Sequence, residues 1–72
     1  MLHHKDDRKW LESQINRLPE RLIPVAVQGY EKAYKEAWAN AKTNPEREGD
    51  ARRVANTRLR HYIAKVLKEP VQ

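Results

Sequence analysis

The sequence predicts an all-α fold, namely a small three-helix domain with a proline-bracketed turn between the first and second helices. Apolar residues recur at helical spacing in three segments, and prolines and one glycine separate these segments. No stretch shows the alternation of apolar and polar residues that is typical of a strand. The chain has 72 residues and no cysteine, which suits one small domain without disulfide bonds. We expect a single domain over residues 1–72, with flexible tails at residues 1–5 and 68–72.

The first helix is expected to begin at Asp6 or Asp7, as its N-cap, and to run to about Leu18. Its apolar stripe consists of four residues: Trp10, Leu11, Ile15 and Leu18. Pro19 and Pro24 bracket the turn that follows, because proline disfavours helical geometry in the residue before it.

Pro24 also suits the first turn of the second helix, where its missing N–H costs nothing. This helix shows the clearest helical period in the chain, carried by Val27, Tyr30, Tyr34, Ala37, Trp38 and Ala41. The aromatic row in it could offer a platform on which nucleobases stack. We interpret the row as core instead, because it coincides with the apolar stripe of its helix. Asn44 and Pro45 are expected to end the helix.

The third helix is expected to span about Ala51 to Leu67, with Asp50 as its N-cap after Gly49. One side of it is apolar: Ala51, Val54, Ala55, Leu59, Tyr62, Ile63 and Val66. The opposite side carries Arg53, Thr57, Arg60 and Lys68, and Arg58 and Lys65 flank the seam between the two sides.

Positive charge is concentrated in this last segment. The whole chain has 15 basic and 10 acidic residues, a net charge of +5. Six of the basic residues but only two of the acidic ones, Asp50 and Glu69, lie between Gly49 and Gln72. A balanced body with one basic helix indicates a module that presents this helix to an acidic surface.

The preferred hypothesis is a small regulatory or adaptor protein that binds the acidic surface of another protein. Electrostatic attraction by the third helix would bring the partner in, and an apolar residue would anchor it. The expected partner-binding residues are Arg53, Thr57, Arg60, His61, Lys65 and Lys68, with Trp10 and Leu22 as anchors. Trp10 could instead pack inside the fold.

The alternative is direct binding of DNA or RNA through the same helix, with its cations on the phosphate backbone. A helix-turn-helix is disfavoured, because the link from Thr43 to Asp50 is about twice the usual three- or four-residue turn. A membrane is a weaker candidate partner, since the apolar side of the helix is rich in alanine and has Tyr62 as its only aromatic residue. Self-association remains open, because a core of this size gains stability from a partner.

The sequence argues against an enzyme and requires no cofactor. It has no cysteine nucleophile, no glycine-rich phosphate loop and no zinc-ligand spacing. His3, His4, Asp6 and Asp7 are metal-capable, but a frayed terminus gives a metal no fixed geometry, so no metal site is expected. The N-terminus has no apolar stretch of the signal-peptide type, and we expect a cytoplasmic protein.

Part of the chain resembles the ChaB-like family. The resemblance rests on the segment from Tyr30 to Trp38, on the segment from Ala51 to Ala55 followed by Leu59, and on Leu18-Pro19 and Ile23-Pro24 upstream. It spans about residues 18–65, and Asn56 stands where the family usually carries a second tryptophan. Family members are associated with the regulation of cation transport, and viral relatives with nucleic-acid binding. The resemblance therefore implies a small regulatory module without catalysis.

Overall fold

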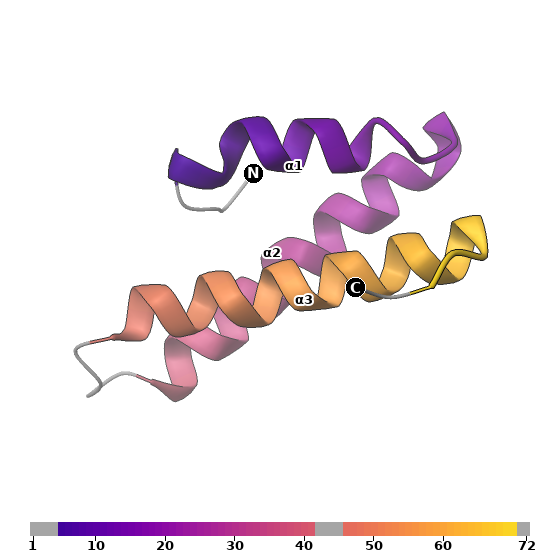
Figure 1. Ribbon diagram of the computed structural model, residues 1–72. Coiled ribbons are helices and arrows are strands. Elements are labelled where there is room, and N and C mark those ends of the chain that lie inside the picture. The colour runs from indigo at the N-terminus through magenta and orange to yellow at the C-terminus, as the bar shows by residue number, and fades with distance from the viewer. Residues whose placement is uncertain (1–4, 42–45, 71–72) are drawn as a thin grey trace.

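The computed structural model describes residues 5–41 and 46–70, and over these residues it is helical throughout its regular elements (Figure 1). Three α-helices follow one another: α1 (Arg8–Ile15), α2 (Ile23–Asn40) and α3 (Arg47–Leu67). Two short 3₁₀ helices, η1 (Lys5–Asp7) and η2 (Glu20–Leu22), precede α1 and α2. The described residues contain no strand. The predicted all-α, three-helix fold is confirmed.

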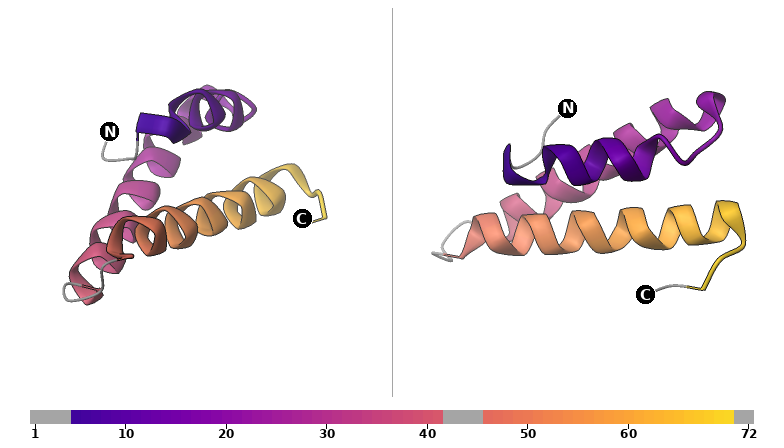
Figure 2. Two further views of the ribbon diagram at one scale, coloured as in Figure 1. Left: turned by 60° about the vertical axis from the view of Figure 1, so that its left-hand side comes forward. Right: turned by 45° about the horizontal axis from the view of Figure 1, so that its top comes forward.

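Helices α2 and α3 form the main pair of the fold. They meet at the link between them and diverge from it, as the left view of Figure 2 shows. Helix α1 lies over α3 on the side where the pair opens (Figures 1 and 2). Helix α3 therefore has α2 along one flank and α1 along another, and only its remaining surface faces solvent.

The core lies where the three helices meet. Its largest fully buried side chains are Leu11 from α1, Tyr30 from α2 and Ile63 from α3. Small residues fill much of the remaining space and let the helix axes approach closely: Ala26, Ala33, Ala51 and Ala55 are all buried.

The aromatic row of α2 is core at one end only. Tyr30 and Tyr34 are buried, as predicted, whereas Trp38 is 39% exposed. The rings of Tyr34 and Trp38 stack with 6.4 Å between their centroids. The guanidinium of Arg47 lies 4.6 Å from the centre of the Trp38 ring, and its Nε donates a 3.2 Å hydrogen bond to the Trp38 carbonyl oxygen. Trp38 thus ties the beginning of α3 to the end of α2.

The predicted end of the first helix is wrong by three residues, because α1 stops at Ile15 and not at Leu18. Proline at position 19 disfavours helical geometry in the residue before it. The backbone N–H of Leu18 accordingly bonds to the Ile15 carbonyl in a turn, at 3.0 Å, although the Leu18 side chain remains buried. The proline-bracketed turn is present, and Pro24 sits in the first turn of α2, as predicted.

The predicted start of the third helix is also wrong. Helix α3 begins at Arg47, so Asp50 is not its N-cap and instead lies in the first turn, with Glu48. The Asp50 backbone N–H donates to the Glu46 carbonyl oxygen at 2.9 Å, as inside a helix. Acidic side chains near a helix N-terminus interact favourably with the helix dipole. Glu48 and Asp50 therefore favour a helix that begins before Gly49.

Several expectations fall at the edges of the described residues. Helix α2 ends at Asn40, while Asn44 and Pro45, its predicted end, lie outside the part of the chain that the structure describes. The same holds for residues 1–4 and 71–72 of the two predicted tails. Residues 68–70 are described, and there the backbone N–H of Glu69 donates to the Ala64 carbonyl oxygen at 2.8 Å.

Candidate functional site

Helix α1 is joined to α3 by polar contacts, beginning with a network around Asp7. Asp7 occupies the N-cap position of α1, but its side chain makes no capping bond. Its carboxylate accepts two 3.0 Å hydrogen bonds from Nε and Nη2 of Arg52, and a 3.4 Å bond from Nδ2 of Asn56. Tyr30 donates a 2.7 Å hydrogen bond from its hydroxyl to Oδ1 of Asn56. The network therefore connects all three helices.

Burial and the charges of this network shift the pKa values of side chains in and beside it. Burial and then the negative charge of Asp7 raise the pKa of Tyr30 to about 12. Burial and then the charge of Glu48 raise the pKa of Tyr34. The hydrogen bond to Asp7 is the main cause that raises the pKa of the Arg52 guanidinium. Arg52 is therefore a permanent cation whose guanidinium is held by Asp7, because a bidentate bond of this kind fixes its orientation.

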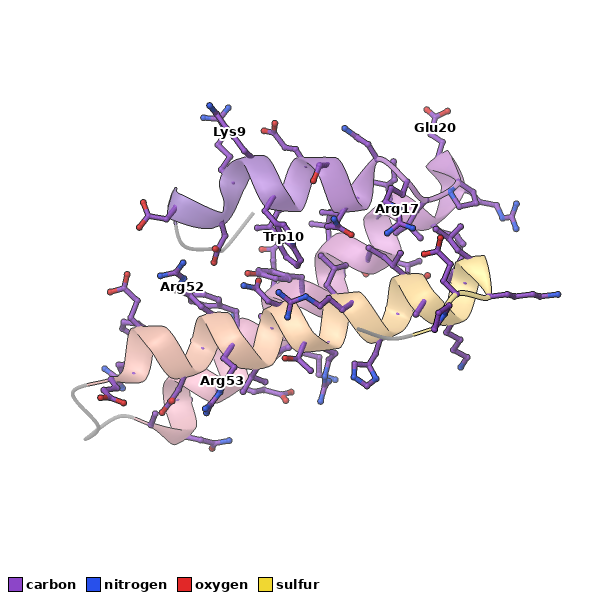
Figure 3. The ribbon with its side chains drawn as sticks, viewed as in Figure 1. Lys9, Trp10, Arg17, Glu20, Arg52 and Arg53 are labelled. Atoms are coloured by element: carbon purple, nitrogen blue, oxygen red, sulfur yellow. The ribbon has the colours of Figure 1, made fainter. Side chains whose placement is uncertain are left out.

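Two further contacts join α1 to α3 along its length. The guanidinium of Arg60 lies 5.0 Å from the centre of the Trp10 ring. Beyond it, Arg17 forms an ion pair with Glu69, which follows α3. Figure 3 shows Trp10 of α1 and Arg17 of the turn after α1 directed toward α3, while Arg52 points from α3 toward α1.

The opposite side of α3 presents the surface that the sequence singled out. In Figure 3 Arg53 points away from α1. We call this surface the outer face of α3 and define it by seven exposed residues: Arg53, Val54, Thr57, Arg58, His61, Lys65 and Lys68. Five of them line a shallow hollow on the helix: Arg53, Val54, Thr57, Arg58 and His61.

The structure differs from the sequence expectations for this helix at two residues. Arg60 is exposed, as expected, but its guanidinium lies over the Trp10 ring and not in the hollow of the outer face. Val54 is not core but 38% exposed, and it lies within the basic hollow. Arg58, predicted at the seam, lines the same hollow.

Most cations of the outer face are not held by ion pairs within the described residues. Within residues 5–41 and 46–70, Arg58, Lys65 and Lys68 have no ion-pair partner. Arg53 pairs with Asp50 at 3.2 Å, but its side chain is 74% exposed. Such a surface pair contributes about 0.2–1 kcal/mol, so it does not commit Arg53 to the fold.

The two expected apolar anchors lie elsewhere. Trp10 is half-buried at the edge of the core and lines a different cleft, between α1 and the end of α3. Leu22 is half-buried at the end of η2, where its backbone N–H donates to the Pro19 carbonyl oxygen at 2.9 Å. Neither residue lines the hollow of the outer face. The cleft beside Trp10 was not predicted from the sequence, because Arg17 and Glu69 are 52 residues apart and no helical periodicity relates them.

Among the residues that the structure describes, no three metal-ligating side chains gather into a group that could hold an ion. His3 and His4 lie outside these residues. None of the described helices combines the length and the apolar character that crossing a bilayer requires.

Comparison with known proteins gives no relative from which a role could be transferred. Searches for a matching family model, a similar curated protein and a similar solved structure each find no match to this chain.

Proposed function

We propose that this protein is a non-enzymatic regulatory or adaptor protein that binds an acidic surface of another protein through the outer face of α3. The observation that carries the proposal is the hollow of that face, where exposed Val54 lies among Arg53, Arg58 and His61. An apolar centre with a charged border is the usual anatomy of a protein-binding surface.

The charge along the face supports the same proposal. No acidic residue occurs between Ala51 and Lys68. The cations from Arg53 to Lys68 extend over about 22 Å at 1.5 Å per helical residue. A single-sign row of this length attracts an acidic partner and orients it during encounter.

DNA or RNA is the second candidate for the same face. The observation that favours it is the same row of cations, three of which have no ion-pair partner within the described residues. Thr57 and His61 stand between these cations and could donate hydrogen bonds to phosphate oxygens. This alternative does not include a helix-turn-helix. The link between α2 and α3 spans residues 41–46, which is longer than the turn of that motif.

A pair of charge-reversal variants tests the proposal. Arg53→Glu with Arg58→Glu reverses two charges in the hollow, and Lys32→Glu with Lys35→Glu reverses two exposed charges on α2. Each protein is used to capture partners from a nuclease-treated lysate, and the affinity for the captured protein is then measured. We expect the α2 variant to bind like the wild type and the α3 variant to lose binding, while circular dichroism shows equal helicity.

Salt dependence separates the two candidates. Binding of duplex DNA would give a logarithmic slope of about −0.9 for each phosphate neutralised, together with loss of the complex after nuclease treatment. A protein partner would survive nuclease and show a shallower slope. If the α3 variant binds every captured partner as tightly as the α2 variant does, the outer face is not the binding site.

The relationship to ChaB-like proteins and a cytoplasmic location belong to this proposal. The first is supported by the motif residues from Leu18 to Leu59, and the second by the absence of cysteine from the chain.

A further inference from the structure

We propose that the cleft between α1 and the end of α3 is a carboxylate-binding site. In this structure Glu69 of the same chain occupies it, and an acidic segment of a partner protein takes its place on binding. The cleft is distinct from the outer face of α3, so this inference holds or fails independently of the function proposed above.

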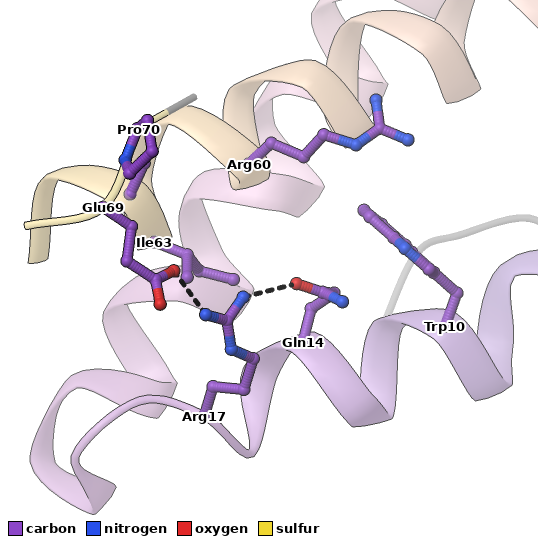
Figure 4. Close-up of a pocket in the computed structure, with 8 residues that line it drawn as sticks. Trp10, Gln14, Arg17, Arg60, Ile63, Glu69 and Pro70 are labelled. Carbon is purple, nitrogen blue, oxygen red and sulfur yellow. Dashed lines mark hydrogen bonds and ion pairs between the residues drawn. The ribbon is translucent and has the colours of Figure 1, made fainter. Parts of the chain in front are cut away.

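The cleft combines two cations with an aromatic wall and an apolar floor (Figure 4). Its volume is about 370 Å³. Its walls come from α1, from α3 and from the segments that follow each of them: Trp10, Gln14, Arg17, Arg60, Ile63, Ala64, Glu69 and Pro70. Ile63 and Ala64 are buried and form the floor. One guanidinium group from α3 and one from the turn after α1 therefore face one small space.

The two arginines differ in how they are held. Arg17 donates a 3.3 Å hydrogen bond from Nη1 to Oε1 of Gln14, and its Nη2 contacts the Glu69 carboxylate. Gln14 thus keeps the planar fork of Arg17 in the orientation that a carboxylate requires. Arg60 lies over the Trp10 ring and has no carboxylate partner within the part of the chain that the structure describes. The site can therefore accept more negative charge than Glu69 supplies.

The segment after α3 reaches the cleft through an unusual backbone conformation. Lys68 has φ 55°, the left-handed region, and it is the only non-glycine residue with positive φ in the described chain. This turn reverses the backbone so that the Glu69 N–H bonds to the Ala64 carbonyl oxygen at 2.8 Å. Glu69 and Pro70 then lie against the cleft (Figure 4). The chain holds its own acidic segment in the site.

This internal occupant is held weakly enough to exchange. The side chains of Arg17 and Glu69 are both more than one-third exposed. Ion pairs of this exposure contribute little, because water and salt screen them. An external carboxylate that also contacts Arg60 would gain an interaction that Glu69 lacks.

The lining defines the ligand as an acidic residue next to a proline or another apolar residue in an extended peptide. Its carboxylate would pair with Arg17 and Arg60, and the apolar neighbour would cover Trp10 and Ile63. Arginine and tryptophan are the residue types most often found where binding energy is concentrated. The internal Glu69-Pro70 pair has this same chemistry.

Nuclear magnetic resonance on the full-length protein tests the proposal. The probe is an acetylated peptide with the sequence of residues 68–72, and its control is the same peptide with glutamine in place of glutamate. We expect the glutamate peptide to shift the Trp10 indole N–H and the Nε–H signals of Arg17 and Arg60, and the glutamine peptide to leave them unchanged. Glu69→Gln should increase the affinity by about 1.4- to five-fold, which corresponds to the free energy of an exposed ion pair.

Matched variants decide whether the effect is local. Glu12→Gln removes the same charge from α1 in an exposed pair with Arg8 and should leave the affinity unchanged. Arg17→Gln should abolish peptide binding, whereas Arg21→Gln, on exposed η2, should not. Equal shifts with both peptides, or equal affinities of the Glu69→Gln and Glu12→Gln proteins, would overturn the proposal. So would shifts with inorganic phosphate or oligonucleotide but none with the peptide.

Discussion

The hydroxyl group of Tyr30 should affect stability in opposite directions at neutral and alkaline pH. At neutral pH it donates a 2.7 Å hydrogen bond to Asn56 from a side chain that is almost fully buried. Removing one partner of such a bond costs about 1 kcal/mol. We therefore expect Tyr30→Phe to lower the free energy of unfolding by about 1 kcal/mol at a pH of about 8.

At alkaline pH the sign reverses, because the folded state then resists ionisation of Tyr30. Burial and the Asp7 charge raise its pKa from 10.0 to about 12. A group whose folded pKa is raised contributes its stability fully below the unfolded value and loses it as the pH rises through the folded value. One pH unit in this window corresponds to about 1.4 kcal/mol. The wild type should lose that amount at a pH of about 11 and the variant should not, so the two stabilities should become equal near this pH.

Urea denaturation followed by circular dichroism, at a series of pH values from about 8 to 12, measures both proteins. Charges that act alike on both proteins cancel in their difference. The charge of Tyr34 does not cancel, because it also raises the pKa of Tyr30 and so adds to the expected effect in the wild type. The free energy of unfolding of the wild type minus that of Tyr30→Phe should change from positive to negative as the pH rises across the series. A difference that stays constant would refute the reasoning, because it would mean that Tyr30 ionises equally easily in the folded and unfolded chain.

Two backbone predictions concern α2 and the end of α3. Gly29 lies within α2, and a Cβ added there meets no atom within 4 Å; Gly29→Ala should therefore raise the free energy of unfolding by about 1 kcal/mol, measured by urea denaturation. Lys68 has φ 55°, which costs a side-chain-bearing residue roughly 1 kcal/mol. Lys68→Gly should stabilise the protein by a similar amount, whereas Lys65→Gly, inside the helix, should destabilise it by about 1 kcal/mol. The backbone explanation is wrong if both glycine substitutions have the same sign.

Local sequence signals accounted for the helices but not for their ends. The spacing of Tyr30 and Tyr34 predicted a buried stripe, and both are buried. Pro19 and Pro24 predicted the turn, because proline restricts its own backbone and that of its neighbour whatever the rest of the fold does. The start of α3 was missed, because Gly49 and Asp50 suit a helix start as well as its first turn.

The candidate site was harder to predict, because it depends on which flank of α3 each neighbour covers. Helical periodicity placed Arg60 opposite the apolar side, but it carries no information on where α1 packs. Asp7 and Arg52 are 45 residues apart, and neither is unusual in its own segment. Only the arrangement of the helices shows that Arg52 belongs to an internal network and Arg58 to the surface.

The six cations after Gly49 therefore do not form one uniform basic surface. The fold engages Arg52 with Asp7 and Arg60 with Trp10, and it leaves Arg53, Arg58, Lys65 and Lys68 on the outer face. Added salt acts on both groups, since it screens binding at the outer face and also weakens the exposed Arg17–Glu69 pair that helps to seat α1. A loss of binding in salt is thus evidence for the outer face only when the Trp10 signal shows that α1 has stayed in place. The Asp7–Arg52 pair favours that outcome, because the Asp7 side chain is only 12% exposed and is the least accessible to screening ions among these ion-paired side chains.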